Sequence, residues 1–421
     1  MSILQPQYVW FWVFDGFSIF KISAGIAILA VIFAGLKKKV DFSVYNNGIV
    51  WGLLGLLVLY YISDMVSPFQ SFSSSVSSDL VIGIYLTIVI MFFVVLGLIN
   101  NKRAAMGLAW SIIAITIYYA YWANDKYFSY NWAYFENGRL LGPFNSPYAD
   151  GNALSIIFVI GLPFILFGIF AVKKVWLKAL LILSLPFIWH GIILCASRGA
   201  LLSAGVASLA TAFMVRSKVF NIFIGIGVCL FIIDQGAQLT ARTSNTIAVA
   251  QTESEEPINP RLISWKAGFD LSLKHPILGV GPERFQQAVR FYFPGRTPHV
   301  AHSTLINFLA NLGYIAAFIY LYFFYKSWRL YKENNEILKQ KFDESYEFLN
   351  KATFVSLIGF FVGAMFLDLI IFEPFYFLLI LMVSVNYLLK KVHLTSEVEN
   401  EKPVPNSPMN RRIRQTGAVQ N

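Results

Sequence analysis

The sequence predicts an all-helical protein that crosses a membrane many times, and three observations support this prediction. Of its 421 residues, 57% are hydrophobic and only 13% are charged, whereas soluble domains carry roughly 25% charged residues. Aromatic residues make up 17% of the chain, with 39 Phe and 21 Tyr, and aromatic side chains are enriched at membrane interfaces. The apolar residues also gather in long runs, and a helix needs about 20 such residues to cross the hydrocarbon core.

About eleven apolar runs are candidates for transmembrane helices. They cover residues 17–36, 48–65, 80–99, 104–123, 153–172, 179–196, 200–215, 219–233, 304–325, 352–371 and 375–389. The aromatic segment 8–14 is too short to cross alone, so it lies in the membrane interface or forms part of a twelfth helix. The sequence therefore predicts an all-α polytopic membrane protein with about 11 to 12 transmembrane helices.

Basic residues fall on alternate loops, and this placement sets the predicted orientation. Clusters such as Lys37–Lys39, Lys102–Arg103 and Lys390–Lys391 all fall on one side of the membrane. Because short cytoplasmic loops are enriched in Lys and Arg, that side is expected to be the cytoplasm. The net charge of +10 arises largely from these loops, so it indicates membrane topology and not binding of nucleic acid.

One loop on the opposite side, residues 234–302, is far longer than the others, and loops of this length are usually functional or disordered. Apolar residues recur at helical spacing over 261–274, and residues 283–292 are a candidate for a second helix. The expected organisation is an N-terminal transmembrane bundle (1–233), a large structured loop (234–302), C-terminal transmembrane helices (303–392) and a disordered cytoplasmic tail (393–421).

Cationic residues on the non-cytoplasmic side are the strongest candidates for a binding site, because topology depletes them there. Arg198 lies between two apolar runs, where it either faces an interior cavity or extends to the lipid headgroups. The large loop adds Arg261, Lys266, Lys274, Arg284, Arg290 and Arg296. Guanidinium groups pair with phosphate oxygens in a bidentate way, so the set indicates an anion-binding site. Any one of them alone is better explained by solvation or by contact with anionic lipid.

Histidines and carboxylates near the same face are candidates for proton transfer. His299 and His302 precede a predicted transmembrane helix, and a histidine there can accept a proton from a hydroxyl near neutral pH. Asp368 is expected inside the run 352–371, with Glu373 just beyond its outer end, where Glu373 can pair with an arginine. Ionisable groups in a membrane are functional candidates. The sequence has no His-Glu-x-x-His motif and no cysteine pair at ligand spacing, so neither a metal nor a cofactor is expected.

Several features of the chain occur together in one family. They are the plan of many spans with one large late loop, the stretch Asn259-Pro260-Arg261-Leu262-Ile263-Ser264-Trp265, the stretch His275-Pro276-Ile277-Leu278-Gly279-Val280-Gly281, the pair His302-Ser303 followed by Gly313, and Ser197-Arg198-Gly199. In this combination the chain resembles the O-antigen ligase and O-antigen polymerase superfamily. Ala316, three positions after Gly313, departs mildly from the ligase signature of that family.

The resemblance implies a fold and a reaction. The fold would be a GT-C-like membrane glycosyltransferase. The reaction would move a preassembled glycan from undecaprenyl diphosphate to an acceptor hydroxyl at the periplasmic face of the bacterial inner membrane, without a metal. By the same resemblance Arg198 and Arg261 would hold the diphosphate and His302 would act on the acceptor. The residue chemistry adds Arg284 to the diphosphate site, and it gives as supporting candidates Lys266, His299, Asp368 and Glu373.

The expected partners are the lipid-linked glycan, membrane lipid and an acceptor whose identity the sequence leaves open. A lipid A-core acceptor, the favoured one, would make the protein an O-antigen ligase. A glycan repeat unit would make it a polymerase, and a secreted protein would make it a protein O-oligosaccharyltransferase. A transporter of lipid-linked sugars is the alternative of another class. Transporters often have internal repeats and polar residues near the bilayer midplane, whereas here the polar residues concentrate at one face.

Overall fold

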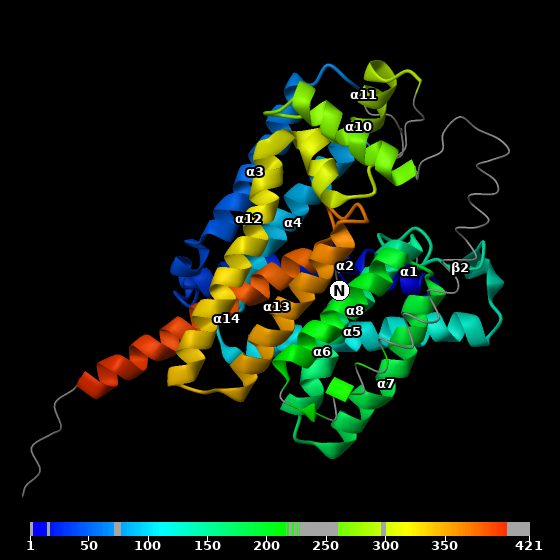
Figure 1. The fold of residues 1–421 in the computed structure, drawn as a ribbon. Helices are drawn as coiled ribbons and strands as arrows, with labels where there is room; N and C mark the ends of the chain where they lie inside the picture. The colour runs from blue at the N-terminus through cyan, green and yellow to red at the C-terminus, as the bar shows by residue number, and fades with distance from the viewer. Residues whose placement is uncertain are drawn as a thin grey trace, which may run out of the picture.

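The computed structural model describes residues 3–14, 17–70, 77–215, 217–218, 221–222, 225, 227, 260–295 and 300–401. Over these residues the chain is almost entirely helical, with one short antiparallel strand pair (Figure 1). The elements are α1 (Pro6–Val9), α2 (Ile19–Leu36), the 3-10 helix η1 (Phe42–Tyr45), α3 (Gly48–Val66), α4 (Ser78–Leu98), α5 (Lys102–Phe128), the 3-10 helix η2 (Trp132–Tyr134), β1 (Phe135–Glu136), β2 (Arg139–Leu140), α6 (Gly151–Ala171), α7 (Val175–Leu194), α8 (Arg198–Met214), α10 (Pro260–Lys274), α11 (Phe285–Tyr292), α12 (Thr304–Gln340), α13 (Glu344–Ala364) and α14 (Glu373–Glu401).

The predicted fold class is confirmed: the protein is an all-α polytopic membrane protein. Nine of the described helices are long and apolar enough to cross a membrane, and α8 is a shorter apolar helix. Ten of the predicted spans correspond to α2 through α8 and α12 through α14. The remaining one, 219–233, lies almost wholly outside the described residues. The segment 8–14 completes α1 and then turns, so it does not form part of a longer helix.

Two boundaries differ from the prediction. Helix α13 ends at Ala364 and not at residue 371, and a loop over 365–372 leads into α14. The loop contains the apolar residues Leu367, Leu369 and Ile370, so its sequence resembles the end of a transmembrane helix. In the structure all three side chains are buried. At the other end of α14 the helix continues to Glu401, past residue 393, where the tail is expected to start. Residues 402–421 of the expected tail lie outside the described residues.

Polar side chains fix the start of many helices. In each case a side-chain oxygen of the residue before the helix accepts a hydrogen bond from a backbone amide of the first turn, which satisfies a donor that has no partner within the helix. The capping residues are Ser18, Asn47, Ser77, Asn101, Asp150, Ser197 and Asp343. Because unpaired backbone amides are costly in lipid, these capping residues determine where each helix begins.

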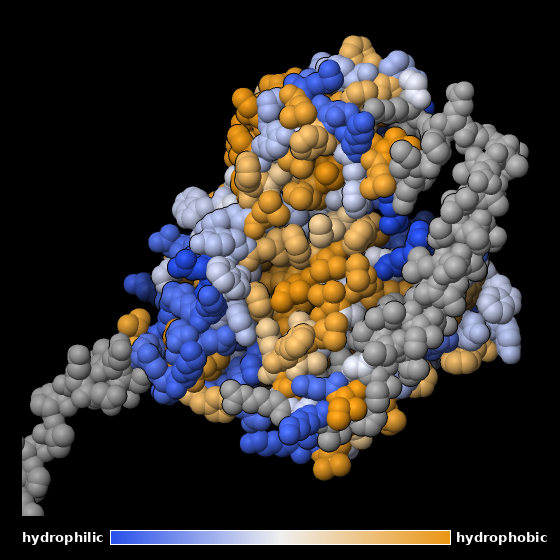
Figure 2. All heavy atoms as spheres, in the orientation of Figure 1, coloured by the Kyte–Doolittle hydropathy of each residue, from blue (hydrophilic) through white to orange (hydrophobic). Residues whose placement is uncertain are grey.

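Helix α6 forms the centre of the bundle, since 83% of its most apolar stretch is buried. Helices α5, α7, α8 and α13 pack against it, and the Ser356 hydroxyl of α13 donates to the Ile160 carbonyl at 2.7 Å. Figure 2 shows hydrophobic side chains over the middle of one face of the bundle, with hydrophilic residues concentrated at its lower left and lower edge. This banding is what a membrane-spanning bundle requires.

Helices α10 and α11 lie together at one end of the bundle, beyond the ends of α3 and α12 (Figure 1). We call this the loop end, and we call the opposite end, where Lys102, Lys351 and Lys390 form ion pairs, the lysine-rich end. The predicted helices 261–274 and 283–292 are thereby confirmed as α10 and α11. They share a small apolar core of their own, which includes Leu271 and Phe285.

The connection between α10 and α11 is tied to a break in α12. Gly313 has φ +80° and interrupts the helix, which leaves carbonyl groups of the preceding turn without helical partners. Backbone amides of Val280 and Gly281 donate to the carbonyls of Ala310 and Asn311, each at 2.9 Å. The loop end is therefore held to the bundle by backbone hydrogen bonds and not only by apolar packing.

We expect Gly279→Ala to destabilise this connection. Gly279 has φ +65°, and a Cβ there would lie 2.3 Å from the carbonyl carbon of Asn311. The left-handed conformation alone costs a non-glycine residue about 1–2 kcal/mol, and the clash adds to that cost. Thermal unfolding of the purified protein should show a lower Tm. Gly83→Ala in α4 is the control, since nothing lies within 4 Å of that Cβ, and equal Tm values for the two variants would contradict the expectation.

Candidate functional site

Arg198 is the first residue of α8 and lies at the turn between α7 and α8, at the loop end of the bundle. Ser197 caps the helix by accepting a hydrogen bond from the Ala200 amide at 3.4 Å. The next residue, Gly199, abuts Phe366 of the loop 365–372, because a Cβ on Gly199 would lie 3.0 Å from the Phe366 Cβ. The Arg198 side chain is exposed, so its charge is presented beside this loop.

Arg261 reaches the same place from α10. It lies one turn before Trp265, and residues four apart share a face of a helix. The Trp265 and Phe366 ring centroids are 6.2 Å apart, so Phe366 is contacted by α10 as well as by α8. Burial lowers the pKa of Arg261, and the positive charges of Arg198 and Arg139 lower it further. Like charges lower a pKa only when they are near, so Arg198 and Arg139 both lie near Arg261.

Arg139 is a member of this group that the sequence reasoning does not single out. It lies in β2, and its guanidinium group donates to the Cys195 carbonyl at 3.4 Å and to the Asn152 side-chain oxygen at 3.1 Å. Cys195 ends α7, only three residues before Arg198, so these bonds anchor Arg139 at the same turn. The available signal was topological, because Arg139 is a basic residue in a predicted non-cytoplasmic loop, where such residues are depleted.

The three arginines form what we call the arginine cluster: Arg139, Arg198 and Arg261. Within the part of the chain that the structure describes, none of the ion pairs found involves Arg198 or Arg139. Like charges at one place repel, and a bound anion offsets that repulsion. Guanidinium groups also donate in parallel pairs to phosphate oxygens. The arrangement therefore suits an anion with several oxygens, such as a phosphate or a diphosphate.

His302 lies immediately before α12, half-buried, with φ +46°. Two residues later the Thr304 hydroxyl donates to the Leu367 carbonyl at 2.7 Å and accepts from the Leu369 amide at 2.9 Å. These bonds hold the start of α12 against the loop 365–372. His302, Arg198 and Arg261 thus come from three different elements that all contact this one loop.

Arg284, which is expected at the diphosphate site, forms an ion pair in the structure. Its Nη1 forms an ion pair with the Asp64 Oδ1 at 2.8 Å and donates to the Asp64 carbonyl at 3.3 Å. The pair joins the start of α11 to the end of α3 and neutralises the arginine, so we leave Arg284 out of the arginine cluster. Lys266 is exposed on α10. His299 and Arg296 lie outside the described residues.

Asp368 lies in the loop 365–372 and not inside a transmembrane helix, because α13 ends earlier than expected. Its carboxylate accepts a hydrogen bond from the Asn307 side chain of α12. Part of the side chain is exposed, yet the surrounding protein desolvates the carboxyl and raises its pKa to about 6. Among the described residues, no group of three or more His, Cys, Asp or Glu is gathered in the way that a metal ion requires.

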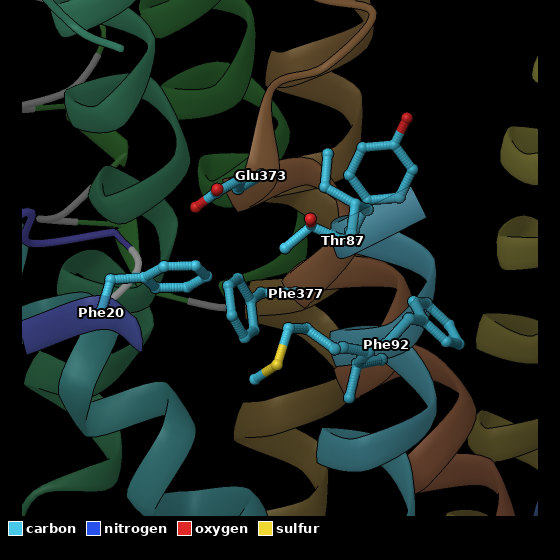
Figure 3. Close-up of a pocket in the computed structure, with 9 residues that line it drawn as sticks. Phe20, Thr87, Phe92, Glu373 and Phe377 are labelled. Atoms are coloured by element: carbon cyan, nitrogen blue, oxygen red, sulfur yellow. The ribbon is translucent and has the colours of Figure 1, made fainter. Parts of the chain in front are cut away.

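Glu373 begins α14 and lines a pocket between α2, α4 and α14 (Figure 3). Its carboxylate extends from α14 toward the gap, above the rings of Phe20 and Phe377 (Figure 3). The pocket is at the periphery of the bundle, since α2 has no buried residue. The structure therefore places Glu373 between elements other than those that supply the arginine cluster.

The comparison with known families matches residues 179–321 to the O-antigen ligase family. This stretch includes α7, α8, α10, α11 and the first half of α12, and so it includes Arg198, Arg261 and His302. No curated protein matches the chain. The family match confirms the resemblance that the sequence predicts: residues 179–321 of this multi-pass membrane protein match the O-antigen ligase family, whose members are glycosyltransferase-like enzymes.

Proposed function

We propose that this protein moves a preassembled glycan from undecaprenyl diphosphate to an acceptor hydroxyl at the periplasmic face of the bacterial inner membrane. The favoured acceptor is lipid A-core, which makes the protein an O-antigen ligase. One observation supports the proposal most: arginines from α8, α10 and β2 gather at one end of the bundle. The start of α12, which follows His302 by two residues, contacts the loop 365–372.

In the proposed reaction the arginine cluster binds the diphosphate of the donor. The acceptor hydroxyl gives its proton to His302 while its oxygen attacks the anomeric carbon of the first sugar. The bond between that carbon and the phosphate oxygen breaks, and the diphosphate leaves with the electron pair. Guanidinium groups already in place stabilise the charge that develops on the leaving group. They supply the positive charge that a metal ion provides in other transferases, so we propose that the reaction is independent of metal.

Water competes with the acceptor for the same anomeric carbon, so the site has to limit its access. Helix α10 contacts the loop 365–372 through Trp265 and Phe366. Helix α11 packs on α10 through the apolar core of the loop end. We propose that these two helices cover the reacting groups on the side away from the membrane.

Arg139→Ala is expected to lower the rate of transfer by roughly 10- to 100-fold, the effect of losing a charged hydrogen bond of about 1.5–3 kcal/mol. Arg139→Lys should recover only part of the rate, because lysine binds phosphate as a point charge. The control is Lys126→Ala, which removes a cation that is already paired with Asp125 at 3.0 Å. Steady-state transfer assays in liposomes would measure the effect, and an equal loss in both variants would argue against a role for Arg139 at the diphosphate.

Reconstitution tests the proposal directly. Purified protein in liposomes would receive undecaprenyl-diphosphate glycan together with lipid A-core, a glycan repeat unit or a Ser/Thr-containing secreted protein, in separate reactions. Product with lipid A-core supports the ligase. Product only with the repeat unit or the protein reassigns the acceptor within the same chemistry. Movement of the lipid-linked glycan across the bilayer, with no product in any reaction, would replace the enzyme by a transporter.

A further inference from the structure

Two carboxylates outside the arginine cluster, Glu283 and Asp368, belong to segments that are both hydrogen-bonded to α12. Glu283 belongs to the segment that connects α10 to α11. That segment lies against α12, because the Gly281 amide donates to the Asn311 carbonyl at 2.9 Å. On the other side of the segment, the Ser78 hydroxyl donates to the Pro282 carbonyl at 2.7 Å. Glu283 itself has φ +57° and follows this anchored stretch directly.

Asp368 reaches the same face of α12 from the loop 365–372. Its carboxylate accepts from the Asn307 side chain, and the Asn311 side chain, one turn further along α12, donates to Asn307. Both asparagines are almost fully buried, with exposed fractions of 4% and 3%. A continuous hydrogen-bonded path therefore links the loop that carries Asp368 to the segment that carries Glu283.

Tyrosines lie near the two carboxylates, since Tyr60 interacts electrostatically with Glu283 and Asp368, and Tyr320 interacts with Asp368. Tyr60 of α3 and Tyr320 of α12 have buried hydroxyls without a hydrogen-bond partner in the described structure, and Tyr376 of α14 donates to the Ile370 carbonyl at 2.7 Å. Arg284, which follows Glu283 directly in the chain, forms an ion pair with Asp64 of α3. Across the described residues neither Glu283 nor Asp368 has an ion pair.

Desolvation by the surrounding protein, with no ion pair to either group among the described residues, makes it costly to ionise both carboxyls. Burial, and after it the charge of Asp368, together raise the pKa of Glu283 to about 7. Burial also raises the pKa of Asp368, against the effect of its hydrogen bond from Asn307. Two carboxylates that interact in a desolvated region cannot easily both carry a negative charge, and one proton shared between them removes the repulsion.

We propose that Glu283 and Asp368 share one proton at neutral pH and act as positioning residues that hold the segment 279–284 and the loop 365–372 together around α12. The start of α12, with His302, is fixed to the same loop through Thr304. Loss of the shared proton separates the two carboxylates and loosens the support of His302. The effect of the pair on glycan transfer rests on the proposed function, whereas the proton sharing does not.

Thermal unfolding as a function of pH tests the pair without any substrate. A carboxyl whose pKa is raised by folding stabilises the fold only while it keeps its proton, so stability falls as pH rises through the folded pKa. The wild type should therefore lose stability between about pH 5 and pH 8. Glu283→Gln, which cannot ionise, should have the higher Tm at pH 8, by roughly 2–4 °C, and a Tm close to that of the wild type at pH 5. Asp79→Asn, which removes an exposed carboxylate at the start of α4, should follow the wild type.

The pH profile of transfer tests the connection to His302. In the wild type the rate should fall on the alkaline side as the shared proton is lost, and in Glu283→Gln the fall should move to higher pH by about one unit or more. If Glu283→Gln and the wild type lose Tm equally between pH 5 and pH 8, the shared proton is refuted. If only the transfer profiles coincide, the pair exists but does not position His302. Absence of transfer in every protein would refute the proposed function and leave the unfolding result standing.

Discussion

Arg198→Ala and Arg261→Ala are each expected to lower glycan transfer by roughly 10²- to 10³-fold, the range found when one preorganised donor to a developing negative charge is removed. Both side chains are expected to contact the diphosphate most closely when it becomes a leaving group. The loss should therefore appear mainly in kcat. Transfer assays with a saturating lipid-linked donor would measure it.

Arg198→Ala should not destabilise the protein, and this separates binding from a structural role. Burial and then the like charges of Arg198 and Arg139 lower the pKa of Arg261, so removal of the Arg198 charge relieves repulsion in the protein without ligand. The Tm of Arg198→Ala should equal or exceed that of the wild type. Arg329→Ala, which removes an exposed arginine at the lysine-rich end, should change neither rate nor Tm. A lower Tm with a proportionate loss of active protein would indicate that the cluster only supports the fold.

His302→Asn is expected to abolish measurable transfer, because a positioned general base contributes about 10²- to 10⁴-fold. Asparagine is the better substitution here than alanine. His302 has φ +46°, and asparagine tolerates the left-handed region whereas alanine is strained there. His302→Asn should therefore keep the wild-type Tm, while His302→Ala loses transfer and also some stability. Normal transfer by His302→Asn would remove the imidazole from the proposed mechanism.

Much of the fold can be predicted from the length of the apolar runs, and the errors of that prediction have a clear physical cause. Ten predicted spans correspond to helices, because lipid requires each span to satisfy its own backbone hydrogen bonds. The predicted run 352–371 extends past the end of α13, because the loop 365–372 is as apolar as a transmembrane helix. In the structure Leu367, Leu369 and Ile370 of this loop are buried by its neighbours, and the Leu369 amide donates to the Thr304 hydroxyl. Hydropathy along one segment contains no information about a partner supplied by another helix.

The candidate site can be predicted only in part, because some of its residues stand in local motifs and others depend on contacts made by the fold. Arg198, Arg261 and His302 stand in short local motifs, so the sequence was enough to select them. Arg139 has no such motif, and its position depends on bonds to Cys195 and Asn152, which the fold brings to it. Arg284 was selected from its loop, yet it pairs with Asp64, 220 residues away in the chain. Contacts of this range arise from packing and leave no pattern near either residue.

Binding of lipid phosphates tests the central claim most directly. Undecaprenyl diphosphate and undecaprenyl monophosphate share one tail and differ only in the anion, so their difference in Kd isolates the anion site. We expect the wild-type protein in nanodiscs to bind the diphosphate at least tenfold more tightly, which corresponds to about 1.4 kcal/mol. Arg198→Ala and Arg261→Ala should reduce that preference strongly. Equal affinity of the wild type for the two lipids, or an unchanged preference in both variants, would contradict the assignment of the arginine cluster to a diphosphate.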